Sequence, residues 1–218
     1  MEDICSDIFQ ENRSSIKIKK KRIGVKNLSN IFEATLKLSN KKGFKTMSLR
    51  DLCKETGLSM GALYSYFKNK DELLNIIQQK GRLMVEKVLR ENIEDINDSK
   101  KKLETAIYSH LYLSEIMQPW FFFSYMETRH FHKDEHKKGI ESELYTEQIF
   151  IDILEQGKKE NIFFVENTVL TASVIKAMLQ DWYLKHGKYI RRKIKVEEYA
   201  SFIVKLILAY IAANPLNK

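Results

Sequence analysis

The chain has 218 residues and a formal net charge of +8, and it contains only 8 glycines and 2 prolines. A chain of this length can bury a substantial core, and its scarcity of helix-breaking residues favours an all-α fold. No apolar run approaches the roughly 18 residues that a membrane-spanning helix needs, and the N-terminus lacks the pattern of a signal peptide, so we expect a cytoplasmic protein that does not enter the membrane.

The positive charge is concentrated at one end of the sequence. Residues 1–70 contain 15 Lys and Arg against 7 Asp and Glu, whereas residues 71–218 contain 22 of each kind. A localised excess of this kind attracts the phosphate backbone of a nucleic acid or the surface of an anionic membrane.

Residues 1–26 are expected to form a basic arm that leads into the first helix. Their last eleven residues read IKIKKKRIGVK. Basic arms of this kind reach a groove or the backbone of DNA in some proteins, and in others they are solvated tails. Both interpretations stay open for this segment.

The first two helices are marked by their termini. The first is predicted over Asn27–Lys42, because apolar residues recur at helical spacing and Gly43 suits a left-handed C-terminal cap. Ser48 suits the N-cap of a second helix. That helix is expected to stop at Thr56 and Gly57.

A third, short helix is predicted to follow the turn at Gly57, with Ser59 as its N-cap and Met60–Phe67 as its body. Leu63 and Phe67 are four residues apart and are expected to face the core together. A helix, a tight turn and a short second helix are typical of the helix-turn-helix motif, which inserts its second helix into the major groove of DNA.

The remaining sequence is expected to be helical as well. A fourth helix is predicted from the capping pattern at Asn69 to about Ile96. Further amphipathic or apolar segments predict five more helices, at approximately Lys101–Met117, Pro119–Phe131, Glu135–Glu160, Thr168–His186 and Val196–Ala213.

Residues 30–74 resemble the N-terminal domain of the TetR family of bacterial transcriptional regulators. This stretch reads NIFEATLKLSNKKGFKTMSLRDLCKETGLSMGALYSYFKNKDELL, and it carries the family's apolar first helix, Lys-Gly-Phe end, Gly-Leu-Ser turn and Lys-Asp-Glu-Leu close in register. The resemblance implies a helix-turn-helix DNA-binding domain over residues 27–72. It also implies a larger helical ligand-binding and dimerisation domain over residues 73–218, with about nine helices in all.

The resemblance assigns roles in DNA binding to residues of the motif. Phosphate contacts or base contacts are expected at Ser48, Arg50, Ser59, Met60, Gly61, Ala62, Tyr64, Tyr66 and Lys70. Met60 departs from the Lys or Gln that such proteins often carry there. Because a methionine offers a base only apolar contact, we expect base reading to depend more on Arg50 and on DNA shape.

The resemblance also implies a small-molecule effector and a homodimer paired through the last two long helices. An aromatic cluster after Gln118 is the best candidate for an effector pocket, although aromatic residues also fill ordinary cores. The predicted lining is Trp120, Phe121, Phe123, Tyr125, Met126, Arg129, His130, Trp182 and Tyr183.

These observations predict a DNA-binding regulator that is not an enzyme and needs no cofactor. His132 and His136 have helical spacing, but we expect a solvated helix edge there and no metal site. Two alternatives remain at this point: a basic amphipathic protein that binds membrane surfaces, and a helical enzyme that uses the aromatic pocket.

Overall fold

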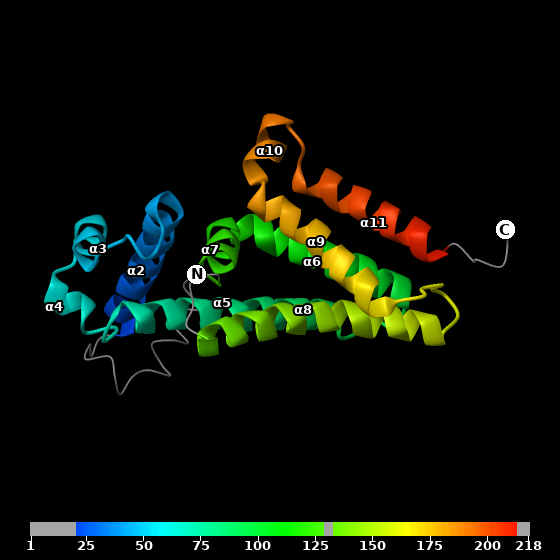
Figure 1. Ribbon diagram of the computed structural model, residues 1–218, viewed down its shortest axis with the longest axis horizontal. Helices are drawn as coiled ribbons and strands as arrows, with labels where there is room; N and C mark the ends of the chain where they lie inside the picture. Colours follow the sequence, from blue (N-terminus) through cyan, green and yellow to red (C-terminus); the bar gives the residue numbers. More distant parts are fainter. Residues whose placement is uncertain (1–20, 129–132, 213–218) are drawn as a thin grey trace. The chain divides into compact units, whose positions relative to one another are not determined.

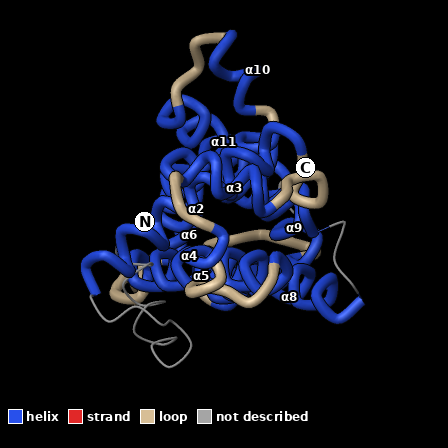
Figure 2. Tube along the Cα trace, turned by 90° about the vertical axis from the view of Figure 1, so that its left-hand side faces the viewer, coloured by secondary structure: helices blue, strands red, loops and turns tan. Residues whose placement is uncertain are grey.

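The computed structural model of the protein describes residues 21–128 and 133–212. Within these residues all regular secondary structure is helical, in ten helices labelled α2 to α11 (Figure 1). Figure 2 shows the same helices joined by short loops, without a strand in the described part. The predicted all-α fold is therefore confirmed. None of the described helices is long and apolar enough to cross a bilayer.

The chain forms two compact units, and it passes between them more than once. Unit 1 contains the chain up to Met84 and a second segment that begins at Phe122, and unit 2 contains Val85–Phe121 and the chain from His130 onward. Two helices therefore contribute to both units, namely α5 (Lys70–Ile93) and α7 (Gln118–Thr128).

Unit 1 is built on three N-terminal helices, α2 (Lys21–Lys42), α3 (Leu49–Thr56) and α4 (Met60–Leu63). Helix α2 begins at Lys21, earlier than the predicted Asn27, so the last part of the expected basic arm is helical. Residues 1–20 of that arm lie outside the described residues. The core of the unit is apolar and includes Leu28, Ile31, Phe32, Leu52, Leu63 and Phe67.

Residues of α7 complete unit 1, although Glu127 lies 83 positions further along the chain than Phe44, which it contacts. The ring of Phe123 meets the ring of Phe44 edge-on, with 5.9 Å between the centroids. The backbone N–H of Phe44 donates to Oε1 of the buried Glu127 at 3.1 Å. Ser124 donates to the Gln78 side chain of α5 at 2.7 Å. These contacts fix the loop after α2, whose Gly43 adopts a left-handed φ of 82°.

Unit 2 is organised around α6 (Ser99–Ile116), which contacts α8 (Lys133–Lys159), α9 (Thr168–Leu184) and α11 (Val196–Ala212). Asp98 caps α6 by accepting from the Lys101 N–H at 2.6 Å, so the helix begins slightly before the predicted Lys101. Among the described helices, the six-residue α10 (His186–Arg191) is the one that the sequence did not predict.

The connector between α8 and α9 packs on Gly157 of α8. The carbonyl of Gly157 accepts from the N–H groups of Ile162 and Phe163 at 2.9 and 3.0 Å, and the Phe164 N–H donates to the Ile211 carbonyl at 2.7 Å. The Phe163 ring is buried over the glycine. A Cβ built on Gly157 would lie only 2.0 Å from that ring.

Candidate nucleic-acid interface and effector site

Helix α3 begins with a complete capping box. Oγ of Ser48 accepts from the Asp51 N–H at 3.2 Å, and the Asp51 carboxylate accepts from the Ser48 N–H at 2.8 Å. The Lys42 ammonium lies 2.6 Å from the same carboxylate. Hydrogen bonds from Lys42 and then from Ser48 lower the pKa of Asp51 well below its usual value. The predicted N-cap is confirmed, and it ties the start of α3 to the end of α2.

The turn between α3 and α4 is held by Thr56 and Gly57. Gly57 takes a left-handed φ of 72° and caps α3. The Thr56 hydroxyl donates to the Leu52 carbonyl at 2.7 Å and accepts from the Leu58 N–H at 3.2 Å. The Asn30 amide donates to the Thr56 carbonyl at 2.9 Å and so joins the turn to α2. The geometry is that of a helix-turn-helix.

Helix α4 is a single turn. Ser59 caps it by accepting from the Ala62 N–H at 3.2 Å, as predicted. The helix ends at Leu63, however, and not at the predicted Phe67. After Leu63 the chain tightens into a turn, in which the Ser65 and Tyr66 N–H groups donate to the Ala62 and Leu63 carbonyls.

Most of the predicted DNA-binding residues lie at the surface of this motif. Ser48, Arg50, Ser59, Gly61 and Tyr64 are exposed, and Met60, Ala62 and Lys70 are half-buried. The Tyr64 side chain is 49% exposed. These positions come from α3, α4 and the start of α5, so the fold presents them on one continuous motif.

Tyr66 corrects the prediction. The residue is only 5% exposed, and its hydroxyl is buried without a hydrogen-bond partner. The physical reason is the early end of α4, because the tight turn after Leu63 directs the ring inward. Tyr66 is therefore a core residue and is not placed to contact a phosphate.

Lys70 has a structural role that the sequence did not predict. Its ammonium donates to the carbonyls of Lys45 and Met47 at 3.0 and 2.6 Å, and it lies 4.7 Å from the centroid of the Phe44 ring. Partial burial lowers the pKa of Lys70. Two of the three N–H groups of the ammonium therefore hold the loop that precedes α3.

The residues predicted to line one effector pocket fall into separate groups. In unit 2, the Phe121 ring lies 5.1 Å from Trp120 and 5.0 Å from Tyr183. Trp182 belongs to another stack, with Tyr189 and Tyr199 at 4.9 and 5.1 Å. Phe123, Tyr125 and Met126 belong to the α7 segment of unit 1, where Phe123 packs on Phe44 and Met126 is exposed.

Two members of the predicted pocket, Arg129 and His130, lie outside the described residues, as does His132. Among the residues that are described, His, Cys, Asp and Glu do not gather in any group of three that could hold a metal ion.

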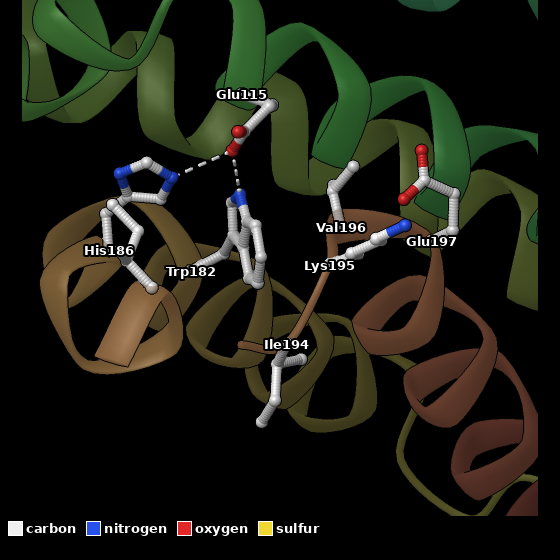
Figure 3. A pocket seen from close by; sticks show the side chains of 8 residues that line it. Glu115, Trp182, His186, Ile194, Lys195, Val196 and Glu197 are labelled. Atoms are coloured by element: carbon white, nitrogen blue, oxygen red, sulfur yellow. Dashed lines mark hydrogen bonds and ion pairs between the residues drawn. The ribbon is translucent and has the colours of Figure 1, made fainter. Parts of the chain in front are cut away.

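A surface pocket of about 430 Å³ lies between the end of α6, helices α9 and α10, and the start of α11 (Figure 3). Oε2 of Glu115 accepts from the Trp182 indole at 2.9 Å and lies 3.0 Å from Nε2 of His186. Lys195 and Glu197 line its other side. The sequence predicted only Trp182 here, because the other groups come from three separate segments.

A second polar group lies in the core of unit 2 and was also missed. Its members are His110, Thr146 and Lys176, which are between 1% and 6% exposed. They come from three different helices and lie 36 and 30 positions apart in the sequence, so no local pattern joins them. A solitary histidine in an apolar stretch was the only signal that pointed to them.

The comparisons with known proteins agree with this geometry. Residues 31–77 match the family model described as "Bacterial regulatory proteins, tetR family". The HTH-type transcriptional regulator HbdR of Aromatoleum sp. (strain CIB) is 20% identical over 184 residues, which cover 84% of this chain and 80% of that protein.

Solved structures show the same fold over most of the chain. A bacterial regulatory protein in the tetR family from Rhodococcus RHA1 superposes with a TM-score of 0.76 and 18% identity, over 87% of this chain and 98% of that one. The transcriptional regulator FadR from Bacillus subtilis, in complex with stearoyl-CoA, superposes with a TM-score of 0.68 and 19% identity. The match covers 84% of this chain and 98% of that one. Residues 31–77 therefore form a DNA-binding domain of the tetR type, and the chain as a whole has the fold of tetR-family transcriptional regulators.

Proposed function

We propose that the protein is a homodimeric repressor that binds a palindromic operator and leaves it when a small, largely apolar effector binds. The observation that carries the DNA-binding part is the exposed surface of the helix-turn-helix. There Arg50 and Tyr64 project from a motif whose two helices are capped and whose turn is tied to α2.

Base reading falls on Arg50 in this proposal. An exposed guanidinium can donate two parallel hydrogen bonds to a guanine, whereas the thioether of Met60 offers only apolar contact. Gly61 and Ala62 let the backbone of α4 approach the base edges. Ser48, Ser59, Tyr64 and Lys70 are assigned to phosphates, which fix the register of the motif on the duplex.

The homodimer is supported by two apolar stripes. On α11, Phe202, Leu206 and Tyr210 follow one another at intervals of four residues and are 63%, 48% and 57% exposed. On α9, Val169, Leu170 and Val174 are also exposed. Contiguous apolar surface of this kind on helices marks a protein interface. A second copy of the chain would cover both stripes and present two reading motifs to the two halves of a palindrome.

Control by an effector is proposed as a shift in population between two dimer states. Only a ligand with different affinities for the two states can move that equilibrium. The bound state would hold the two motifs one helical turn of DNA apart, roughly 34 Å, and the effector would favour the other state. The stearoyl-CoA complex of FadR is the fold relative that motivates a largely apolar effector.

A footprinting experiment on the DNA upstream of the protein's own gene tests the proposal. We expect two protected half-sites related by two-fold symmetry, at moderate salt. Uniform protection without a palindrome, or none, would contradict the operator proposal.

The role of Arg50 is tested by selecting preferred sequences from a random DNA pool with the wild-type protein and with Arg50→Ala. If Arg50 reads a base, the variant relaxes the preference at one position of each half-site, at a cost of about 1–3 kcal/mol for the preferred base. A loss of affinity that is equal for all sequences would assign Arg50 to a phosphate instead.

A further inference from the structure

Three polar side chains from three helices meet in the core of unit 2. Nζ of Lys176 on α9 lies 2.8 Å from Oγ1 of Thr146 on α8 and 3.2 Å from Nε2 of His110 on α6. All three residues are at least nine-tenths buried. Polar groups are costly to bury, and one nitrogen of His110 is left unused by the cluster.

The contact with Lys176 determines where the imidazole proton lies. An ammonium can only donate, so Nε2 of His110 must accept and the ring proton must lie on Nδ1. Burial, and then the nearby Lys176 ammonium, hold the pKa of His110 well below its usual value, so the ring stays neutral. Its Nδ1 is buried and has no hydrogen-bond partner on another residue. Nδ1 is therefore an unsatisfied donor.

The surroundings of His110 are aromatic on one side. The Phe121 ring meets the imidazole edge-on, with 5.5 Å between the centroids, and Phe121 in turn contacts Trp120 and Tyr183. A ligand at this place would meet a hydrogen-bond donor next to a positive charge, and an apolar wall beside them.

We propose that this cluster binds the carboxylate of the effector, with one oxygen accepting from Nδ1 of His110 and the apolar body lying along Phe121. The assignment rests on the proposed effector control and names the chemical class of the ligand. A carboxylate fits better than a neutral carbonyl, because the Lys176 ammonium places a positive charge on the other side of the same imidazole.

The cluster is closed in this structure, so the helices that carry it must part to admit a ligand. A ligand that binds only the parted state has the differential affinity that effector control requires.

Binding is tested on the full-length protein with three series of probes, each with a carboxylate, its methyl ester and the matching alcohol. The carboxylates are octanoate, benzoate and 3-phenylpropanoate. Affinities come from the shift of the thermal midpoint with probe concentration. In at least one series we expect the carboxylate to bind about tenfold or more tightly than the other two members. In the same titration, the ¹⁵N-labelled ring of His110 should show its Nδ1 proton moving downfield.

Two substitutions of His110 separate its two nitrogens. His110→Gln keeps an acceptor near Lys176 but removes the donor at the Nδ1 position, and we expect it to lose at least tenfold in carboxylate affinity. His110→Asn keeps a donor near the Nδ1 position and should retain binding better. Thr168→Val is the control for removing a buried polar group that is not part of the cluster. Thr168 is buried as well, and its hydroxyl donates to Glu155 at 2.6 Å.

The proposal is overturned if no carboxylate binds more tightly than its ester and alcohol, or if His110→Gln binds carboxylate as well as the wild-type protein does. Footprinting of the same samples keeps the two proposals apart. Operator protection without carboxylate binding rejects only the ligand class. Carboxylate binding without operator protection rejects the repressor proposal and leaves the site standing.

Discussion

Tyr64 and Tyr66 are two residues apart, yet their surroundings are opposite. Tyr64 is the C-cap of α4 and is half exposed, whereas Tyr66 is buried with its hydroxyl unpartnered. In a continuous helix both phenols would remain near the surface, which is what the sequence suggested. The turn at residues 64–66 separates them and leaves only Tyr64 for a phosphate.

The two tyrosines therefore give a matched pair of variants. Tyr64→Phe should weaken binding to all DNA sequences by about 0.5–1.5 kcal/mol, because it removes one hydrogen bond to the backbone. Tyr66→Phe should leave DNA affinity unchanged, because its ring is buried in unit 1 and does not face the DNA. Fluorescence anisotropy on one operator duplex and one unrelated duplex measures both. An equal loss of DNA affinity in the two variants would show that Tyr66 turns outward on DNA.

The sequence predicted the role of single residues correctly where that role depends only on neighbours in the sequence. Ser48, Gly57 and Ser59 were identified because caps and left-handed turns depend on neighbours a few residues away. Lys70 and His110 were assigned incompletely or missed, because their partners are about 25 and 66 residues distant. A sequence pattern carries little information about such pairs.

At the scale of elements, Asp181 joins α9 to α10. Its carboxylate accepts from Lys188 at 2.6 Å, from the Tyr189 hydroxyl and from Lys185 at 2.5 Å. Partial burial of the carboxyl raises its pKa, but these three hydrogen bonds outweigh that effect and bring the pKa far below its usual value. The carboxylate thus favours the folded state at neutral pH.

Asp181→Asn should lower the unfolding free energy at pH 7 by about 1 kcal/mol, which is near the upper end for a partly exposed ion pair. Because the pKa is depressed in the folded state, this contribution is present above about pH 4 and is lost as the pH falls further. Urea unfolding at a series of pH values should therefore give a flatter acid limb in the variant. Asp152→Asn, which alters an exposed carboxylate of α8, is the control. A parallel acid limb in Asp181→Asn and wild type would refute the linkage.

Gly157 shows how one element restricts another. Gly157→Ala should lower the unfolding free energy by about 1–3 kcal/mol, because the new methyl would overlap the buried Phe163 ring. Gly187→Ala is the matched control, since a Cβ there meets nothing within 4 Å, and it should be neutral or slightly stabilising. Adding Phe163→Leu should recover part of the loss, as measured by a double-mutant cycle in urea. Additive effects of the two changes would argue against the overlap.

The order and type of the helices followed from their hydrophobic periodicity, and their ends differed mainly where a cap lies outside the apolar pattern. Helix α6 begins at Ser99 because Asp98 caps it, and α4 stops early because its last residues form a turn. The effector site was least predictable, because aromatic residues that are close in sequence, such as Phe121 and Phe123, belong to different units.

For the whole molecule, the proposed dimer predicts how a charge on the α11 stripe changes the mass in solution. Leu206→Glu places a charge in the middle of the α11 stripe and should shift the mass measured by light scattering from twice 25.7 kDa toward the single chain. Operator binding should weaken with it, because two linked half-sites bind together. Ile116→Glu is the control, since Ile116 is 79% exposed on α6, outside both stripes. A dimer that survives Leu206→Glu would place the interface elsewhere.

The division of the chain into units also affects how the protein is made. Unit 1 is completed by the α7 segment, whose Glu127 holds the Phe44 N–H and whose Phe123 packs on the Phe44 ring. During synthesis, unit 1 therefore cannot complete its fold until α7 has emerged from the ribosome, well after α2, α3 and α4 have emerged. Unit 1 also cannot be excised at a single linker and fused to the second unit of another regulator. A functional chimera of this protein therefore has to exchange α7 together with the N-terminal helices.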